Sequence, residues 1–429
     1  MRVLVVGANG FIGTAVVTAL HAAGHETRCI VRSSTKFARR FPGCGVESLD
    51  LTSKAARNAD HWSSLLEDID AVVYVAGVLQ PRRSQVAWNV HRDAPNALYT
   101  ACENRGVQRV IHVSATGVTE SQTTYSRTKL AGEECLIGKD LDWTILRPVL
   151  VVGDGSYGGT SMIRALAVSP IVTPVIGDGS IPLGIIHKND LAAGIVELLQ
   201  TKAGDKTVLE PSAAEELPMD AVVTAYRRWF GLPKRPVLGI PNWIAAVLGR
   251  IGDLFHLDPI NSTAVAQFRS TMTGNASQYE QVTGVKPVNL AEILASRPAE
   301  SQDLWHARLF LLRPLIRMCL ALLWLISGIA GLFGTSYLYQ LVIGQLVPGN
   351  WVASISIVAS SINLAIGASL LFGLFLRFMA WVQIGLVLAF TVGLGLLVPS
   401  LWADPYAGLL KNLPILVLLL VHLVVEQER

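Results

Sequence analysis

The last third of this chain contains four long apolar runs, which begin just after Arg308. They extend from about Leu309 to Phe333, Val352 to Leu376, Phe378 to Val398 and Leu409 to Val425. Each run is close to the ~20 residues that cross the hydrocarbon core of a bilayer. A helix in a soluble core normally keeps a polar stripe, and runs as uniform as these do not. The sequence therefore predicts a transmembrane domain of four helices over residues 308–429, following a water-soluble domain.

Basic residues predict how these spans are oriented. Arg308, Arg313 and Arg317 flank the first run, and Arg377 lies in the short second connection. The loop from Gly334 to Asn350, by contrast, carries no charge. Connections that contain Lys and Arg stay in the cytoplasm. We therefore expect a multi-pass protein of a bacterial inner membrane, with its N-terminal domain and both termini in the cytoplasm.

Polar residues within the runs predict contacts between the helices. Asn363 is at depth in the second run and Gln383 is early in the third, whereas Lys411 and His422 are close to helix ends. Long or ring-bearing side chains near an end reach the interface. We expect Lys411 and His422 to do so, and Asn363 to form a hydrogen bond between helices.

Composition limits the other classes of function. The net charge of +3 is too small to favour nucleic-acid binding. Five cysteines are scattered without metal-ligand spacing, which fits reduced thiols and implies no metal site. They are Cys29, Cys44, Cys102, Cys135 and Cys319.

A glycine-rich turn near the N-terminus predicts a dinucleotide site. The apolar run from Met1 to Val6 leads directly into this turn, and a helical pattern follows from Thr14 to Ala23. Glycines let the backbone approach a pyrophosphate, whose charge is stabilised by amides at the helix N-terminus. The expected contacts are Gly7, Asn9, Gly10, Phe11, Ile12 and Gly13.

The second strand predicts which dinucleotide binds. It covers Glu26 to Val31 and ends at Arg32, where an NAD-specific site would place an acidic residue for the ribose 2′-hydroxyl. A guanidinium suits a 2′-phosphate instead. We therefore favour NADP(H), with NAD(H) as the alternative. The basic residues that follow are Lys36, Arg39 and Arg40.

Further strand-like runs alternate with helical stretches and predict an α/β fold, a Rossmann-type doubly wound parallel sheet. They are Gly45–Leu49, Ala71–Val75, Arg109–Val113 and Trp143–Leu146. Ligands of such sheets bind at the carboxyl ends of the strands. Asp50, Ala76, Gly77 and Pro148 follow those ends, so we expect them in the cofactor site.

A tyrosine and a lysine four residues apart predict acid–base chemistry. Tyr125 and Lys129 occupy one face of a helix, since residues with this spacing are neighbours. A neighbouring ammonium favours the ionised phenol, so Tyr125 could exchange a proton with a carbonyl or alcohol while hydride moves to or from a nicotinamide. Lys129 would also bind the ribose. Ser114 follows the preceding strand and could orient the substrate oxygen, with Thr116 as its rival.

These motifs together resemble the extended and atypical short-chain dehydrogenase/reductase superfamily. The likeness covers about residues 1–300 and rests on the glycine turn, Ala76-Gly77, Asn89, Ser114-Ala-Thr, Tyr125 with Lys129, Arg147-Pro148 and Ile186-His187-x-x-Asp190. It is nearest to the branch that includes the NADPH-binding accessory subunit of respiratory complex I. The membrane tail resembles DoxX-like four-helix domains. This resemblance implies a cofactor-binding domain over residues 1–300 with a small α-rich substrate lobe at about 205–300.

One helical pattern in the lobe has an apolar stripe. The stripe comprises Trp243, Ile244, Val247, Leu248, Ile251, Leu254 and Phe255, and it lies opposite Arg250, Asp253 and His256. Apolar residues at this spacing usually face a core. We expect the helix to pack on the core of the lobe, with contact to lipid as the alternative.

Two functions are compatible with these features. The first is a membrane-tethered NADP(H)-dependent oxidoreductase acting on a carbonyl or alcohol of a lipophilic small molecule, such as a quinone, an isoprenoid or a sterol-like compound. The second is an NADPH-binding structural or assembly subunit of a membrane complex, without turnover. An epimerase or dehydratase of nucleotide sugars is disfavoured by Arg32 and by the membrane tail. Membrane lipid is an expected partner, and a membrane-protein partner and a homo-oligomer both stay open.

Overall fold

The computed structural model describes residues 1–429 apart from 202, 258–259, 270–271, 334–347, 404–407 and 427–429. Most of the uncharged loop from Gly334 to Asn350 thus lies outside the described residues. The chain forms two compact units. The first comprises Met1–Gly249 and Asn261–Ala307, and the second comprises Arg250–Ile260 and Arg308–Arg429.

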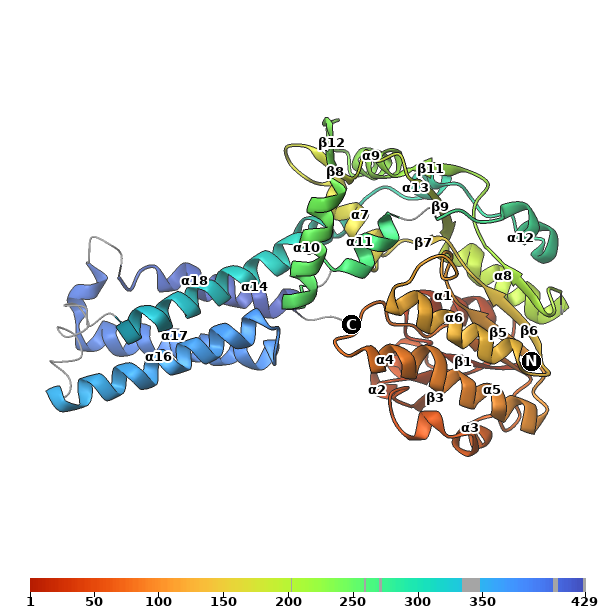
Figure 1. Ribbon diagram of the computed structural model, residues 1–429, viewed down its shortest axis with the longest axis horizontal. Coiled ribbons are helices and arrows are strands. Elements are labelled where there is room, and N and C mark those ends of the chain that lie inside the picture. The colour runs from red at the N-terminus through yellow and green to blue at the C-terminus, as the bar shows by residue number, and fades with distance from the viewer. Residues whose placement is uncertain (202, 258–259, 270–271, 334–347, 404–407, 427–429) are drawn as a thin grey trace. The chain divides into compact units, whose positions relative to one another are not determined.

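A seven-stranded parallel sheet with helices on both faces forms the centre of the first unit (Figure 1). Its strand order is β10-β6-β5-β4-β1-β2-β3. The bounds are β1 (Arg2–Val6), β2 (Glu26–Val31), β3 (Gly45–Ser48), β4 (Ala71–Tyr74), β5 (Arg109–Val113), β6 (Asp142–Leu146) and β10 (Thr207–Leu209). The order reverses beside β1, and such a switch point is where ligands of open α/β sheets bind. The predicted Rossmann-like sheet is confirmed.

Alternation of side chains along β1 explains the two layers of helices. Val3 and Val5 contribute to one core and Leu4 and Val6 to the other, because successive side chains of a strand point to opposite faces. The first core includes α1 (Phe11–Ala22) and α8 (Lys188–Thr201), and the second includes α3 (Ala59–Leu65), α5 (Ala94–Arg105) and α6 (Thr124–Ile137). The first helix begins at Phe11, earlier than the predicted Thr14, so Phe11, Ile12 and Gly13 are helical.

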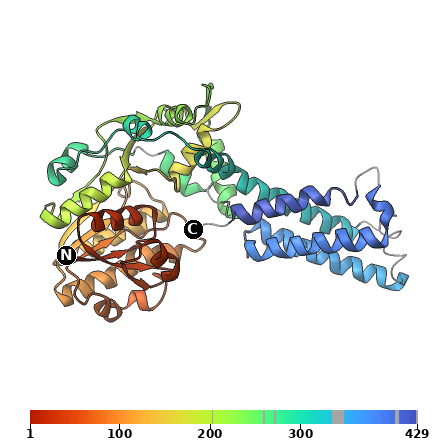
Figure 2. The same cartoon turned by 180° about the vertical axis from the view of Figure 1, so that it is seen from behind.

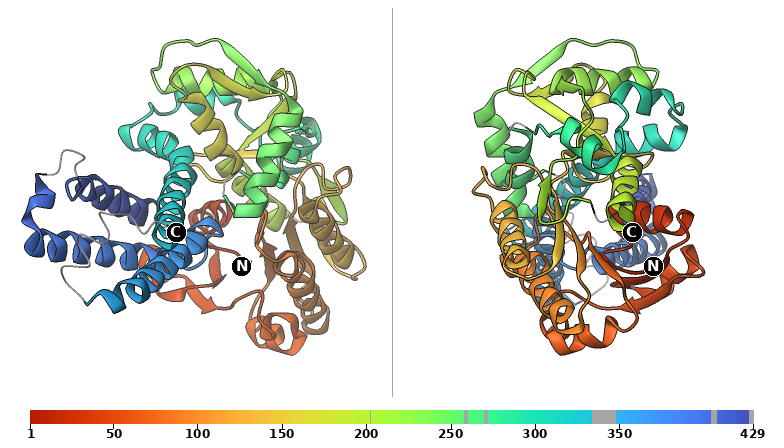
Figure 3. Two further views of the ribbon diagram at one scale, coloured as in Figure 1. Left: turned by 60° about the vertical axis from the view of Figure 1, so that its left-hand side comes forward. Right: turned by 90° about the vertical axis from the view of Figure 1, so that its right-hand side faces the viewer.

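Shorter helical elements complete the part of the first unit around the main sheet. They are α2 (Ser34–Arg40), η1 (Ala55–Arg57), α4 (Ser84–Trp88) and the π-helical turn η2 (Asn89–Asp93). The elements of the first 200 residues are coloured red to yellow-green in the two views of Figure 3.

A third core, built around two small sheets, forms the lobe. One sheet has the order β11-β9-β7 and the other pairs β12 with β8. The bounds are β7 (Leu150–Val152), α7 (Gly159–Ala167), β8 (Thr173–Ile176), β9 (Pro182–His187), β11 (Glu216–Pro218), α9 (Met219–Trp229), β12 (Val237–Ile240), α10 (Asn242–Phe255), α11 (Ser262–Phe268), α12 (Ala276–Thr283) and α13 (Leu290–Ala295). Residues 205–300 supply only part of this core, since α7 and β7–β9 precede them and β10 pairs with β6 in the main sheet.

The apolar stripe of α10 faces solvent, and the prediction that it packs on the core of the lobe is wrong. Trp243, Val247, Leu248, Ile251 and Leu254 are between 41% and 70% exposed. The buried side of the helix instead carries small residues, Ala245, Gly249 and Gly252.

In the described part of the second unit, four apolar helices run alongside one another (Figure 2). They are α14 (Ser301–Phe333), α16 (Gly349–Leu371), α17 (Leu376–Leu397) and α18 (Asn412–Val425), with a 3₁₀ turn, η3 (Pro399–Trp402), before the last. The first three are long and apolar enough to cross a membrane. The fourth has 14 residues and begins at Asn412 instead of Leu409, so the prediction of four full spans is supported for three.

Small residues allow the helices of this unit to approach closely. A Cβ on Gly328 would lie 2.7 Å from the Leu364 side chain, and one on Gly367 would lie 2.7 Å from that of Leu325. Glycine at such contacts is typical of helices packed within a membrane. Large apolar residues fill the rest of the core, among them Leu320, Trp324, Leu370, Ile384 and Leu419.

The polar residues of the second unit differ from expectation. Gln383 accepts a hydrogen bond from the Trp324 indole at 2.8 Å and so joins α17 to α14. Asn363 is half-buried and makes no such bond among the described residues. Lys411 is exposed, but His422 is fully buried, so the expectation that His422 reaches the interface is wrong. The fourth helix packs its histidine inward.

Candidate active site

The glycine turn has the geometry of a cradle for a phosphate. Gly7 has a φ of +90°, which favours glycine, and a Cβ there would lie 2.8 Å from the Ala76 backbone. A Cβ on Gly13 would overlap the Gly7 carbonyl oxygen. Gly10 forms the N-cap of α1, and no side chain caps that helix end. The predicted glycines therefore close a tight turn at the carboxyl end of β1, beside the end of β4, and leave the amino end of α1 uncapped by side chains.

Lys129 lies where β4 and β5 end. Its side chain is 4% exposed, and Nζ donates to the Val113 carbonyl at 2.9 Å and to the Ala76 carbonyl at 3.4 Å. Burial lowers the pKa of Lys129 to about 8, although the Glu133 carboxylate, one helical turn along α6, favours the charged form. Gly77 leaves room for this ammonium, because a Cβ there would lie 3.3 Å from Nζ. The lysine is thus fixed beside the glycine turn.

Tyr125 lies on the same helix, one turn before Lys129. The helix begins behind Thr123, whose hydroxyl caps it by accepting from the Ser126 amide at 3.2 Å. Tyr125 is half-buried, and burial raises its pKa to about 12. The phenol is therefore protonated at neutral pH and can donate a proton to a substrate oxygen.

His91 lies against Tyr125, a contact that the sequence did not reveal. Its ring meets the Tyr125 ring edge-on, with the centroids 5.5 Å apart. Nε2 accepts from the Val78 amide at 3.0 Å, and Nδ1 is 2.8 Å from the Thr128 hydroxyl, which itself donates to backbone carbonyls. Burial, helped by Lys129, holds the pKa of His91 far below its usual range. The neutral ring with its proton on Nδ1 therefore ties the loop after β4 to α6.

The two candidate hydroxyls after β5 have different surroundings. Thr116 donates to the Arg147 carbonyl at 2.7 Å, so its hydroxyl is already committed to the fold. The Ser114 side chain is 5% exposed, and its oxygen has no hydrogen-bond partner among the described residues. A buried hydroxyl without a partner is costly in a fold. Ser114 is therefore the better candidate to bind a substrate oxygen.

An ion pair supports α6, the helix of Tyr125 and Lys129. Arg147 donates to both carboxylate oxygens of the fully buried Glu133, at 3.2 and 3.1 Å from Nε. Pro148 follows at the end of β6, and its carbonyl accepts from the Thr116 amide at 3.1 Å. The Arg147-Pro148 motif thus joins β6, α6 and the segment after β5.

The predicted pocket for a 2′-phosphate is on the surface after β2. Arg32, Lys36, Arg39 and Arg40 are all exposed. Arg40 donates to the Asn9 side chain at 3.4 Å, which brings a basic residue of α2 to the glycine turn. Asp50 accepts from the Thr52 amide and hydroxyl at 2.9 Å and so holds the turn after β3. Arg32 and Asp50, both predicted cofactor contacts, therefore lie at the carboxyl ends of the neighbouring strands β2 and β3.

A cavity of about 350 Å³ opens next to the amino end of α6. Thr123 and Thr124, which directly precede Tyr125, line it. Gln80 from the loop after β4 lies opposite and accepts from the Thr263 amide at 3.2 Å, so α11 of the lobe forms one wall. The remaining lining residues are Leu79, Pro81, Ser84, Gln122 and Ser262. The cavity is thus a candidate substrate pocket.

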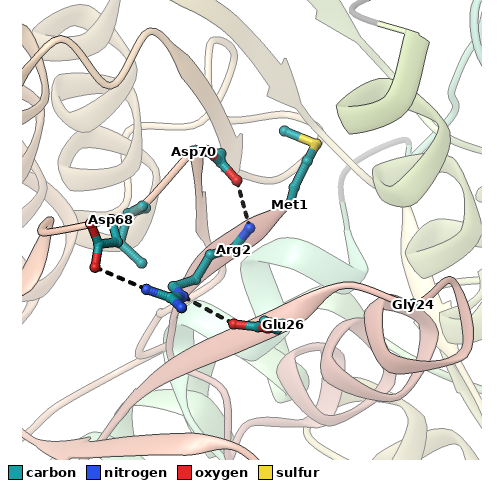
Figure 4. A pocket seen from close by; sticks show the side chains of 7 residues that line it. Met1, Arg2, Gly24, Glu26, Asp68 and Asp70 are labelled. Carbon is teal, nitrogen blue, oxygen red and sulfur yellow. Dashed lines mark hydrogen bonds and ion pairs between the residues drawn. The ribbon is translucent and has the colours of Figure 1, made fainter.

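A second cavity, of about 570 Å³, lies at the amino end of β1, and its charged side chains bind one another or the Arg2 amide (Figure 4). Arg2 pairs there with Glu26 at 3.1 Å and Asp68 at 3.2 Å, and its amide donates to Asp70 at 2.7 Å. Ligands of parallel sheets bind at the opposite edge. This cavity therefore belongs to the fold and not to the site.

The Ile186-His187-x-x-Asp190 motif also serves the fold. The Asp190 carboxylate accepts from the Val288 amide at 2.9 Å, and its carbonyl accepts from the Tyr279 hydroxyl at 3.0 Å. These bonds hold α8 against the end of the lobe. Among the described residues, no group of three His, Cys, Asp or Glu side chains could bind a metal ion.

Comparisons with known proteins agree with this division of the chain. Residues 7–202 match a family described as NAD(P)H-binding, and residues 321–420 match the DoxX-like family. The solved structure of MoeE5 in complex with UDP-glucose and NAD superposes with a TM-score of 0.53 at 22% identity, over 72% of this chain and 99% of that one. A likeness at this identity shows the fold alone.

Two curated proteins are similar to the N-terminal part. The ceramide reductase of Caulobacter vibrioides is 27% identical over 201 residues, which is 46% of this chain and 61% of that protein. The sterol demethylase protein B of Methylococcus capsulatus is 29% identical over 182 residues, which is 37% of this chain and 53% of that protein. The chain thus spans less than two thirds of either relative. Its N-terminal part is thus similar to NAD(P)H-binding proteins, and its C-terminal part is similar to the DoxX-like family.

Proposed function

We propose that the protein is a membrane-tethered, NADP(H)-dependent oxidoreductase that acts on a carbonyl or alcohol of a lipophilic small molecule. The observation that carries this proposal is the position of Lys129. Its ammonium is bonded to the ends of β4 and β5, beside the glycine turn and one helical turn from Tyr125. Tyr125, Lys129 and Ser114 are the catalytic residues in this proposal.

The side chains would divide the proton chemistry between them. A bound dinucleotide would supply or accept the hydride. Tyr125 would donate its proton to the substrate oxygen during reduction, and the Lys129 ammonium would stabilise the phenolate that remains. The unpartnered Ser114 hydroxyl would donate to the same oxygen and orient it. His91 would position Tyr125 through the contact between their rings.

Basic residues near the glycine turn support NADP(H). Arg32 follows β2, and Arg40 already reaches Asn9 in the turn. Arginine recognises phosphate through several donors at once, which gives strong, directional bonds. The dinucleotide contacts in this proposal are the glycine turn from Gly7 to Gly13, with Arg32, Asp50, Ala76-Gly77, Lys129 and Pro148.

The membrane unit supports a lipophilic substrate. Three helices are long and apolar enough to span a bilayer, and two relatives bear the names ceramide reductase and sterol demethylase protein B. Tethering an enzyme to a bilayer raises its effective concentration toward a lipid-dissolved molecule. A quinone, an isoprenoid and a sterol-like compound all fit this class. With the basic connections inside, the catalytic unit and both termini would be cytoplasmic.

The test is NADPH oxidation by the full chain in detergent, supplied with lipid extract from its host. We expect consumption of NADPH by the wild type and a loss of about 100-fold or more in Tyr125→Phe. Ser114→Ala should lose activity as well. Binding of NADPH, followed by its fluorescence, should be unchanged in both variants because neither removes a contact of the glycine turn.

Two controls separate the possible outcomes. NADH in place of NADPH tests the role of Arg32, and the oxidised cofactor with the same extract tests the reverse reaction. Full turnover in Tyr125→Phe would contradict the mechanism. Binding without consumption in both directions would favour the alternative, a structural or assembly subunit of a membrane complex like the complex I accessory subunit.

A further inference from the structure

The exposed face of α10 is a feature outside the site that the proposed function does not explain. Five large apolar side chains lie on this face, which we call the α10 face: Trp243 (70% exposed), Val247 (45%), Leu248 (45%), Ile251 (41%) and Leu254 (61%). The strand β12 precedes the helix and exposes Val237 and Leu238 as well. A continuous apolar surface of this kind normally marks an interaction site.

The opposite side of α10 explains how the helix is held. Gly249 lies so close to α11 that a Cβ there would be 3.0 Å from the Ser262 Cα atom. Ala245 on the same side is 4% exposed. The small residues thus pack α10 against the helix that forms one wall of the cavity beside Tyr125. The apolar stripe is exposed because the side of α10 that packs against α11 has room only for small residues.

The end of α10 belongs to the membrane unit. Residues Arg250–Ile260 cluster with Arg308–Arg429. Arg317 of α14 donates to the Phe255 carbonyl and, at 3.0 Å, to the His256 carbonyl. The Phe255 ring also contacts the Phe372 ring at the end of α16, with the centroids 6.2 Å apart. The last turn of α10 is therefore bonded to two of the membrane helices.

The position of Arg317 along α14 indicates the depth of this contact in the bilayer. From Arg317 to Phe333 α14 rises about 24 Å at 1.5 Å per residue. The hydrocarbon core is about 30 Å thick. Taking Phe333 as the far end of this span, the Arg317 side chain lies near the opposite boundary of the core, and the last turn of α10, with Ile251 and Leu254, lies at the same boundary.

The charges near α10 fit a lipid surface. Lys234 and Arg235 precede β12 and are exposed, and Arg250 is exposed on the helix. Interfacial helices combine an apolar face with basic residues that attract anionic headgroups, and tryptophan is favoured at this depth.

We propose that the α10 face lies in the surface of the bilayer, as an interfacial helix additional to the membrane spans. Trp243, Leu248 and Leu254 would sit at the boundary between headgroups and acyl chains. The contact does not depend on catalysis.

The test uses the full chain in vesicles of phosphatidylcholine and phosphatidylglycerol. The acyl chains carry bromine, which quenches tryptophan, either close to the headgroup or at the bilayer centre. The emission of Trp243 is obtained as the difference between the wild type and Trp243→Phe. We expect most of this emission to be lost with bromine near the headgroup and less to be lost with bromine at the centre.

Charge substitutions supply the matched comparison. Leu248→Asp should restore Trp243 emission because it places a carboxylate in the proposed contact. Ile137→Asp, at a position 48% exposed at the end of α6, should leave the quenching as it is. Both positions are exposed, so neither substitution should unfold the protein.

The result that overturns the proposal is Trp243 emission that is the same in brominated and plain vesicles. If that protein also runs as a dimer that Leu248→Asp dissociates, the α10 face contacts a second copy of the chain instead of lipid. An active enzyme without quenching would leave the proposed function intact and remove this inference. Quenching without activity would support this inference and count against the proposed function.

Discussion

The two units of the chain each contain an arginine–glutamate pair, and the pairs differ in their surroundings. In the first unit Arg147 binds Glu133, with side chains 16% and 0% exposed, behind the helix that carries Lys129. In the second unit Arg313 of α14 binds Glu426, next to the end of α18, with side chains 21% and 5% exposed. Both pairs are bidentate.

The two pairs differ in what could bind the arginine if its glutamate were removed. Around Glu133 the cores of the sheet and α6 exclude water, so Arg147 has few alternatives. Arg313 is near the start of the apolar part of α14, where water and lipid phosphates could bind its guanidinium. An arginine–glutamate pair should therefore hold α6 rigidly in the first unit and only join the ends of α14 and α18 in the second.

Glu133→Gln should produce the largest loss of stability. Leaving Arg147 without its carboxylate should destabilise the first unit by about 3–5 kcal/mol. Glu426→Gln should cost the second unit about 1 kcal/mol, because Arg313 can be solvated. The measurement is thermal unfolding of the full chain in detergent, with one transition followed for each unit. Equal losses of stability in the two variants would contradict the claim that the surroundings of the two pairs differ in effect.

Glu103→Gln is the matched control for this experiment. Glu103 pairs with Lys139 at 3.0 Å in the first unit, but the side chains are 30% and 20% exposed. An ion pair with this exposure is worth less than about 1 kcal/mol. A loss like that of Glu133→Gln would mean that depth of burial is not the cause.

Burial of Lys129 should give the first unit an unusual dependence on pH. Its pKa is lowered from 10.5 to about 8, so between these values the unfolded chain binds the proton and the folded chain does not. Stability should therefore rise with pH through this window, and the charged form costs on the order of 3 kcal/mol below it. The measurement is urea unfolding of the full chain at several pH values. A dinucleotide should oppose the effect, since its phosphates favour the ammonium.

Lys129→Met supplies the comparison for the pH experiment. The variant has no group that titrates at this position, so its stability should rise less from pH 8 to pH 10 than that of the wild type. Identical slopes would show that Lys129 is charged in the folded protein at pH 10, and that Glu133 outweighs burial.

The sequence predicted the sheet, and the elements on which several candidate site residues lie, because both depend on local patterns. The strands Glu26–Val31 and Arg109–Val113 agree to the residue with β2 and β5, since buried parallel strands are short apolar runs. The spacing of Tyr125 and Lys129 sufficed to place both on α6. Their roles in catalysis stay predictions.

Features that depend on long-range packing could not be predicted in this way. His91 acts through the amide of Val78, and no local pattern indicates which loop a buried histidine will meet. The stripe on α10 showed that the helix is amphipathic but not which side is covered, because Gly249 and Ala245 carry little hydrophobic signal. Ser114 and Thr116 were indistinguishable until the bond to Arg147 was known.

Removal of a single side-chain hydrogen bond from each unit should give the smallest and most direct comparison. Thr116→Val removes the bond to the Arg147 carbonyl and should destabilise the first unit by about 1 kcal/mol. Gln383→Leu removes the bond from Trp324 and should destabilise the second unit by about 0.6 kcal/mol, the average for such bonds within membranes. The loss is smaller because helices that separate within a bilayer find other polar partners. Thermal unfolding of the full chain in detergent measures both. A loss in Gln383→Leu well above that in Thr116→Val would mean that this bond, and not the glycine contacts of α14 and α16, sets how the membrane helices pack.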